Sequence, residues 1–123
     1  MSNLKFKNIN SNSNAVLFFQ YHNISFDNIE IENVSCTGDS GDSSFILFDS
    51  GEEHKNLVIE HLNAKTVITN GSFIKIKGDD NSLLIKNSHF NEIHSFGPII
   101  ENKSKKVYIY TYIPYTYTYT YYI

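Results

Sequence analysis

The segment Ser82-Leu83-Leu84-Ile85-Lys86-Asn87 recurs in degraded form along the chain and decides the fold. Its frame is small polar, apolar, any residue, apolar, charged, and then Asn or His. Related copies begin at Asn3, Asn23 and Asn56, and a fifth begins at Lys106. Their first apolar residues lie 20, 33, 26 and 24 residues apart, which is typical of solenoid repeats. These residues are Leu4, Ile24, Leu57, Leu83 and Val107. We therefore expect a stack of similar β turns.

A second apolar run follows each of the first four copies, after a small residue. The runs occupy 14–18, 44–48, 72–76 and 97–100. Turn-forming residues separate the runs, most clearly at 49–51, 69–71 and 77–81, and a longer loop is inserted at 37–44. No window of about 11 residues has a helical apolar period. The sequence predicts an all-β solenoid of about four to five turns over residues 1–106, with a last strand and a Tyr/Thr-rich tail at 107–123.

Period-2 alternation predicts which side chains face inward. Leu57 and Ile59 should stack under Leu83 and Ile85, building one apolar column along the axis. The position after the second inward residue should form a structural ladder of stacked polar side chains. Its members are Asn8, Asn28, His61 and Asn87. One position earlier, Lys7, Asp27, Glu60 and Lys86 should form a ladder of alternating charge.

Composition excludes several classes of function. The chain has 123 residues, 41% of them hydrophobic, and a net charge of -3. Its 10 cationic residues are all Lys and are scattered, so we expect no nucleic-acid partner, because phosphate binding needs a concentrated basic surface. No stretch approaches the roughly 18 apolar residues of a membrane span. The single cysteine, Cys36, makes no intramolecular disulfide, and we interpret it as a small buried residue rather than a nucleophile.

The chemistry-bearing residues form no complete catalytic or metal-binding set. Asp79-Asp80 follows Gly78, the usual composition of a solvated turn. Acidic residues crowd near the inserted loop and are candidate calcium ligands, without regular spacing. They are Asp39, Asp42, Glu52 and Glu53. Glu53-His54 and the pair His89 and His94 lack a third zinc ligand at suitable spacing. We expect no cofactor and no catalytic residue.

Four Asn-x-Ser sequons permit glycosylation in a secretory setting. They begin at Asn23, Asn33, Asn70 and Asn102. The N-terminus reads as repeat and contains no signal peptide. We expect an extracellular or cell-surface location if the chain is part of a longer protein, and a cytoplasmic one if the N-terminus is genuine.

The order of strand, Asn-Ser, apolar strand and polar loop resembles a known repeat. Residues 83–91, 97–100 and 102–104 are similar to the turns of right-handed parallel β-helix proteins of the pectate-lyase-like superfamily, especially the surface or autotransporter-like branch. The resemblance covers residues 3–110 and lacks the double Gly of that pattern. It implies a right-handed coil, here part of a longer solenoid with flanking repeats. The Arg that the enzymes of the superfamily generally use is absent.

The sequence therefore favours a structural or adhesive solenoid segment whose exposed flank, with loops 37–44 and 49–55, contacts carbohydrate or protein. The alternative is a degenerate or truncated polysaccharide lyase or glycoside hydrolase. A third hypothesis, leucine-rich-repeat recognition, draws on Phe26-x-x-Ile29-x-Ile31. The run from Tyr115 resembles the translation of a short nucleotide repeat at a truncated or misread gene end, or else a tail that pairs through its edge.

Overall fold

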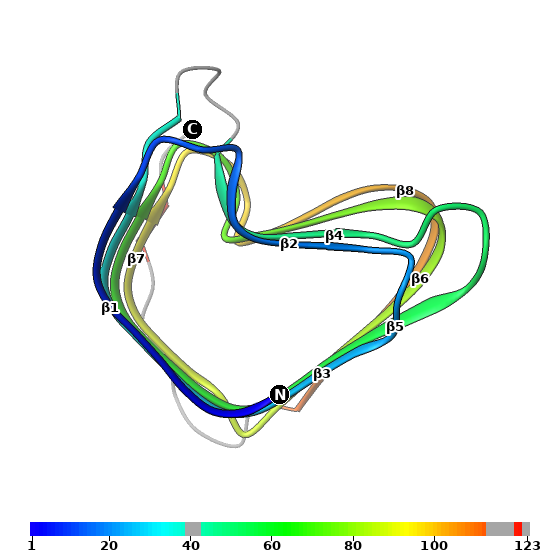
Figure 1. The fold of residues 1–123 in the computed structure, drawn as a ribbon, viewed down its shortest axis with the longest axis horizontal. Coiled ribbons are helices and arrows are strands. Elements are labelled where there is room, and N and C mark those ends of the chain that lie inside the picture. The colour runs from blue at the N-terminus through cyan, green and yellow to red at the C-terminus, as the bar shows by residue number, and fades with distance from the viewer. Residues whose placement is uncertain (39–42, 113–119, 122–123) are drawn as a thin grey trace.

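The protein is a parallel β-solenoid of about four turns (Figure 1). The computed structural model describes residues 1–38, 43–112 and 120–121, with side chains up to residue 106. In Figure 1 the chain runs clockwise from the N-terminus as it recedes from the viewer, which makes the coil right-handed. No helix occurs in the described part of the chain. The strands are β1 (Ser2–Ser11), β2 (Ala15–Gln20), β3 (Ile24–Cys36), β4 (Ser44–Asp49), β5 (Lys55–Thr69), β6 (Ile74–Lys86), β7 (His89–Ser95), β8 (Ile100–Tyr112) and β9 (Thr120–Tyr121).

Every strand pair is parallel, and equivalent positions of successive turns lie in register. Leu57 pairs with Leu83 and Ile59 with Ile85, which confirms the predicted stacking two dozen residues apart. β6 turns a corner within one strand: Ile74–Lys77 pairs with β4, whereas residues 81–86 pair with β5. The segment 77–81, expected as a turn, is therefore a bend inside β6.

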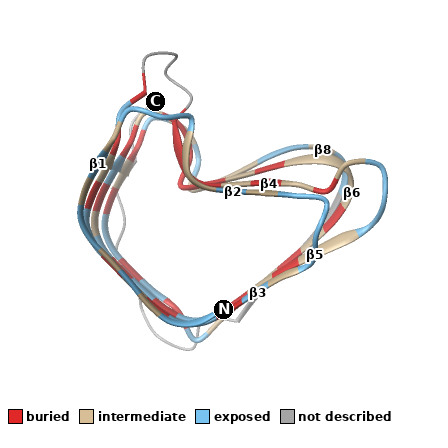
Figure 2. Cartoon of the chain, viewed as in Figure 1, coloured by how far each residue is buried: buried red, intermediate tan, exposed pale blue. Residues whose placement is uncertain are grey.

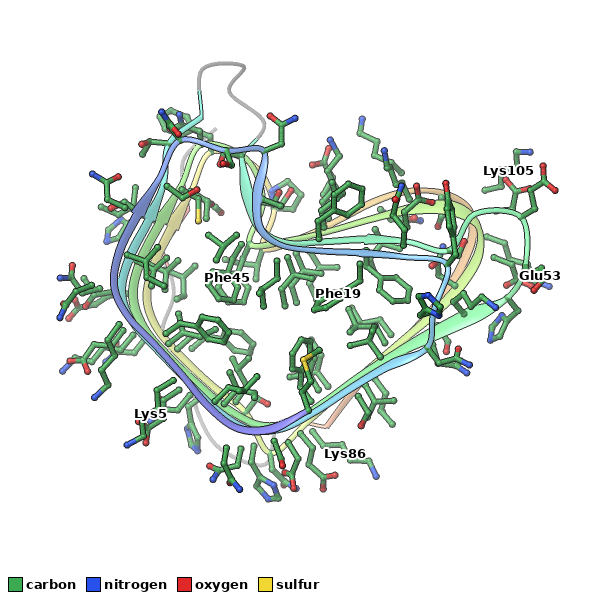
Figure 3. The ribbon with its side chains drawn as sticks, in the orientation of Figure 1. Lys5, Phe19, Phe45, Glu53, Lys86 and Lys105 are labelled. Carbon is green, nitrogen blue, oxygen red and sulfur yellow. The ribbon has the colours of Figure 1, made fainter. Side chains whose placement is uncertain are left out.

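The core is a continuous apolar column inside the coil. Figure 2 shows buried segments at aligned positions of successive strands. An aromatic stack forms its densest part: the rings of Phe45 and Phe73 lie parallel with centroids 5.4 Å apart. Phe6 meets Phe45 edge-on, and Phe90 meets Phe73 edge-on. Figure 3 shows Phe45 and Phe19 pointing into the coil.

Two of the predicted alignments are wrong. Leu4 pairs with Ile29, not Ile24, and Leu83 pairs with Ile109, not Val107. The first error arises because turns one and two each carry Asn at two bends five residues apart. The repeat frame fits either bend, and the register uses the one that leaves the first two turns 25 residues apart. The first error moves the alignment from one bend to the other, and the second moves it to the next inward-facing residue. The architecture is therefore unaffected.

Two long connections adjoin β4. One precedes it at residues 37–43, of which 39–42 lie outside the described residues, and the other follows it at 50–54. In Figure 1 residues 50–54 project from the corner between β4 and β5. Among the described residues, none forms a helix long and apolar enough to cross a bilayer.

Candidate functional site

Two columns of left-handed residues bend the coil, and they fix where its outer surfaces lie. The first column contains Asn3, Asn28, His61 and Asn87, with φ between 50 and 60°. The second contains Asn8, Asn33, Thr66 and Glu92, with φ of 56 or 57°. Asn adopts this conformation at lower cost than other residues with a Cβ, because its short polar side chain bonds locally. Five of the eight positions are Asn.

Within each column, a side-chain hydrogen bond joins the first turn to the second. Asn28 Nδ2 donates to Asn3 Oδ1 at 2.7 Å, and Asn33 Nδ2 donates to Asn8 Oδ1 at 2.8 Å. The expected ladder is therefore divided: Asn28, His61 and Asn87 are equivalent, but Asn8 belongs to the second column. The physical reason is the register of β1, in which Lys7 lies opposite Glu32. Lys7 consequently also leaves the predicted charge ladder, which runs Asp27, Glu60, Lys86.

The bends provide a direct test of this structure. We expect Asn28→Ala to lower the free energy of unfolding by about 1 to 2 kcal/mol, because Ala tolerates a positive φ poorly. Asn28→Gly should cost less, since it removes only the side-chain bond to Asn3 and keeps the bend. Asn63→Ala serves as the control, because Asn63 is exposed, lies on β5 next to β3 and has no positive φ. It should change the free energy of unfolding by no more than about 0.5 kcal/mol. Urea denaturation of the three variants measures the order; equal effects of Ala at 28 and 63 would contradict it.

Ion pairs cover much of the outer surface of β1 and β3. Lys5 Nζ lies 3.6 Å from Glu30 Oε2, and Lys7 Nζ lies 3.4 Å from Glu32 Oε2. At the first bend column, His61 Nδ1 lies 2.9 Å from Asp27 Oδ1. Exposed pairs of this kind contribute little stability, so they keep charges matched between turns rather than hold the coil together. The Asp27 carboxylate thus contacts the His61 imidazole, whereas its neighbour in the ladder, Glu60, carries a like charge.

A polar cluster forms where the connection 50–54 meets the bend of β6. We call His54, Asn56, Asp79, Asp80 and Lys105 the corner cluster. His54 Nδ1 lies 3.0 Å from Asp80 Oδ1, and His54 Nε2 lies 2.9 Å from Asn56 Oδ1. Lys105 Nζ lies 3.2 Å from Asp79 Oδ1. The Asp80 carboxylate, followed by the Asn56 side chain, raises the pKa of His54. Both carboxylates of the expected solvated turn are thus engaged with cations.

The corner cluster is the grouping that the sequence interpretation missed. His54 and Asp80 are 26 residues apart, the same separation that joins Leu57 to Leu83. The repeat spacing could therefore have brought them together. Taken locally, Glu53-His54 indicates only an incomplete zinc site and Asp79-Asp80 only a solvated turn. The raised pKa favours the imidazolium, which makes His54 a counter-ion of Asp80 more than a free base.

A polar hollow lies beside the first bend column. It has a volume of about 420 Å³ and is lined by His61, Leu62, Asn63, Asn87 and His89. Its lining offers imidazole and amide groups from two successive turns. Within the described ranges, however, no group of three or more His, Cys, Asp or Glu residues could hold a metal ion. His61 and His89 therefore lack a third ligand of those types, and His94 lies on a different face, opposite Ile68.

The calcium candidates do not converge in the described residues. Asp39 and Asp42 fall within 39–42, outside the residues that the structure describes. Glu52 and Glu53 are exposed, and Glu53 Oε2 lies 3.4 Å from Lys55 Nζ. A lysine at that distance is a competitor for the carboxylate, not a co-ligand.

The sequons differ in how available their amides are. Asn23 and Asn102 are exposed. Asn33 Nδ2 already donates to Asn8, and Asn70 Nδ2 donates to the Gly38 carbonyl at 3.0 Å. A glycan joins through this nitrogen, so modification at the last two positions would compete with contacts between turns.

One outer surface carries a mixture of aromatic, charged and amide side chains. It is formed by β2, β4, residues 74–77 of β6 and residues 100–103 of β8. We call this surface the flank. Its register gives two outward rows. They are Phe18, Leu47, Lys75, Glu101 and Gln20, Asp49, Lys77, Lys103. Phe18 is 52% exposed. Lys77 Nζ lies 4.0 Å from Asp49 Oδ2, and Lys103 Nζ lies 3.6 Å from Glu101 Oε1. The flank thus sets an exposed ring beside an array of charged and amide groups.

With this geometry in view, comparison with known proteins gives a short result. No protein-family model, curated protein or solved structure matches the chain. The structure itself establishes the parallel β-solenoid architecture, and function has to be argued from its surfaces.

Cys36 is fully buried in the column and faces Ser11 and Thr69 in the neighbouring turns. Burial raises the pKa of its thiol from 9.0 to about 12. A neutral, shielded thiol is a poor nucleophile, in keeping with its interpretation as a packing residue.

The thiol also makes a pH prediction. The pKa of the thiol is raised in the folded state. Below pH 9.0 the thiol is neutral in both states, and its contribution to stability is fully present. Between pH 9.0 and about 12 the thiol ionises in the unfolded chain but not in the folded one, so this contribution is lost as the pH rises. We expect the stability difference between the wild type and Cys36→Ala to shrink by about 1 kcal/mol from pH 8 to pH 10. Tyr and Lys ionise in both proteins and cancel. Urea unfolding at the two pH values measures the difference; a constant difference would contradict the prediction.

Proposed function

We propose that the chain is a non-catalytic structural or adhesive segment of a larger, surface-exposed or secreted β-helical protein. On this proposal the flank contacts carbohydrate or protein. The observation that carries it is the connection 50–54, which follows β4 at the edge of the flank and is longer than the equivalent connection of the first turn, 21–23. The equivalent corner of the next turn is a bend inside β6 without an added loop. Length has therefore been added around the flank, where loops most often carry binding.

The chemistry of the flank supports a carbohydrate ligand. The half-exposed face of Phe18 suits stacking on the C–H groups of a sugar ring. Gln20 and the ionic groups around it supply donors and acceptors for hydroxyl groups. Resemblance to the pectate-lyase-like superfamily supports the same class of ligand, because many of its members act on polysaccharides.

Sedimentation with insoluble or cross-linked acidic and neutral polysaccharides tests the proposal. We expect the wild-type chain to bind at least one of them and Phe18→Ala to bind several-fold more weakly. Ile68→Ala is the matched control, because Ile68 is an exposed apolar residue on a different face of the coil. Binding that Phe18→Ala and Ile68→Ala reduce equally would reject the flank, and binding to none of the polysaccharides would reject a carbohydrate ligand.

The corner cluster favours a second candidate, a degenerate or truncated polysaccharide lyase or glycoside hydrolase. Its specific observation is the contact of His54 with Asp80, which places an imidazole and a carboxylate together at a corner of the coil. Release of reducing ends or unsaturated products from an acidic polysaccharide would be the decisive measurement. Activity that His54→Gln and Asp80→Asn abolish would establish the enzyme and overturn the non-catalytic proposal.

A further inference from the structure

The connection 50–54 is attached to the next turn in different ways at its two ends. At its start, Ser50 and Gly51 make main-chain hydrogen bonds of 3.1 and 2.8 Å with the bend of β6. These bonds do not change with pH. At its end, the side chain of His54 reaches Asp80 of β6. The attachment of this end therefore depends on the charge of one imidazole.

Both ring nitrogens of His54 face oxygen atoms. Nδ1 lies 3.0 Å from Asp80 Oδ1, and Nε2 lies 2.9 Å from Asn56 Oδ1. The Asn56 oxygen also accepts a hydrogen bond from Ser82 Oγ, which orients this oxygen toward the corner. A neutral imidazole has one N–H and one lone pair, whereas the imidazolium has two N–H groups. The imidazolium alone presents a hydrogen atom to both oxygens.

The Asp80 carboxylate gives an independent reason for a cation at this position. Its Oδ1 atom is shielded from water and has no hydrogen bond of standard geometry in the part of the chain that the structure describes. A charged oxygen removed from water is costly unless a cation lies beside it. The His54 ring lies 3.0 Å from this oxygen, so loss of its proton would leave the carboxylate poorly compensated.

Two ion pairs beside His54 involve the neighbouring charges of the corner. Lys105 Nζ lies 3.2 Å from Asp79 Oδ1, and Lys55 Nζ lies 3.4 Å from Glu53 Oε2. Each of these two lysines thus has a carboxylate of its own. The other titratable groups of the connection and of the adjoining turns are Glu52, Lys106, Tyr21 and His22.

The balance of these groups favours the charged imidazole. The Asp80 carboxylate, followed by the Asn56 side chain, raises the pKa of His54 above its ordinary value of 6.5, whereas desolvation and Lys106 lower it. Below pH 6.5 the imidazole is charged in the folded and the unfolded chain, so its contacts are fully present. They are lost as the pH rises through the raised pKa of the folded chain.

We propose that His54 is a proton-operated latch, which holds the connection 50–54 against β6 as the imidazolium and releases the end of the connection when it becomes neutral. The main-chain bonds of Ser50 and Gly51 persist, so the released part is residues 52–54. His54 and Asp80 lie in inner turns of the coil, with described strands on either side. The connection borders the flank, so a ligand there would meet a surface that changes with pH. This last consequence rests on the proposed function, whereas the latch itself does not.

NMR of the whole chain, without any ligand, tests the latch. Backbone ¹⁵N relaxation of Glu52 and Glu53 is measured from about pH 5 upward, until the imidazole signals of His54 have titrated completely. We expect order parameters near 0.85 at the acidic end, typical of a rigid backbone, and below about 0.6 at the alkaline end. The midpoint of this change should coincide with the midpoint of the His54 titration. Order parameters that stay constant while His54 titrates would overturn the proposal.

Three variants assign the change to this pair of residues. His54→Gln removes the titrating group, so the order parameters of the connection should no longer depend on pH. Asp80→Asn removes the carboxylate, so the release should move to lower pH together with the His54 titration. His61→Asn is the matched control, because it removes another imidazole paired with a carboxylate, that of Asp27, and supplies the Asn found elsewhere in the first bend column. A pH-dependent release that persists in His54→Gln, or that His61→Asn abolishes, would refute the inference.

Discussion

Phe45→Ala is expected to be the most damaging single substitution, lowering the free energy of unfolding by about 3 to 5 kcal/mol. Phe45 is fully buried and sits at the centre of the aromatic stack. Its ring packs parallel to Phe73 and receives the edge of Phe6, so its removal leaves a cavity that borders three successive turns. Each neighbouring turn is fixed by ladder hydrogen bonds and cannot collapse into that space.

Phe18→Ala is the matched control. It removes the same ring from the neighbouring strand at a position where the side chain is 52% exposed. We expect a change of about 1 kcal/mol or less, because little apolar area returns to water. Guanidinium chloride unfolding followed by circular dichroism measures both variants. A loss below about 1 kcal/mol for Phe45→Ala would mean that the stack does not form the core.

The fold could be predicted from the sequence because the same few residue types recur at a nearly constant distance. A spacing of 26 residues predicts that Leu57 lies next to Leu83, and the register confirms it. Alternation then gave the inward faces, since a one-residue slip would bring polar side chains into the core. What the spacing could not resolve was the first turn, where Asn3 and Asn8 offer two equivalent alignments.

The surface was harder to predict because its geometry depends on neighbours in other turns. Thr66 and Glu92 adopt a positive φ at the second bend column although neither residue type favours it. The residues before and after them pair in the ladder of β5 and β7, and Thr66 Oγ1 donates to Glu92 Oε2 at 3.0 Å. Contacts between turns therefore hold this conformation, and no local sequence signal marks it. Similarly, the raised pKa of His54 arises from Asp80 on another strand, and the composition of the segment around His54 says nothing about it.

Gly78→Ala should produce the second large effect, a loss of about 2 to 4 kcal/mol in the free energy of unfolding. Gly78 has a φ of 109°, a conformation that side-chain-bearing residues rarely adopt. A Cβ at this position would lie 2.8 Å from the Ser50 amide nitrogen and 2.9 Å from that of Gly51. Strain of this kind and a steric clash each cost about 1 to 3 kcal/mol.

The surrounding backbone cannot move away cheaply. Ser50 N donates to the Lys77 carbonyl at 3.1 Å, and Asp79 N donates to the Gly51 carbonyl at 2.8 Å. These bonds clamp the two turns together on either side of Gly78. Any shift that makes room for a methyl group must stretch one of them, which adds to the strain.

Gly97→Ala provides the control for the same change of side chain. A Cβ at Gly97 would meet only Ser72 Oγ, at 3.8 Å, and the residue has no positive φ. We expect a change within about 1 kcal/mol of the wild type. Thermal or urea unfolding compares the two variants, and equal losses of stability would show that Gly78 is not specially constrained.

The Gly78 bend also aligns Asp80 with His54. NMR titration of Gly78→Ala should therefore show the pKa of His54 returning toward its ordinary value. An unchanged His54 titration would mean that the corner cluster forms independently of this bend.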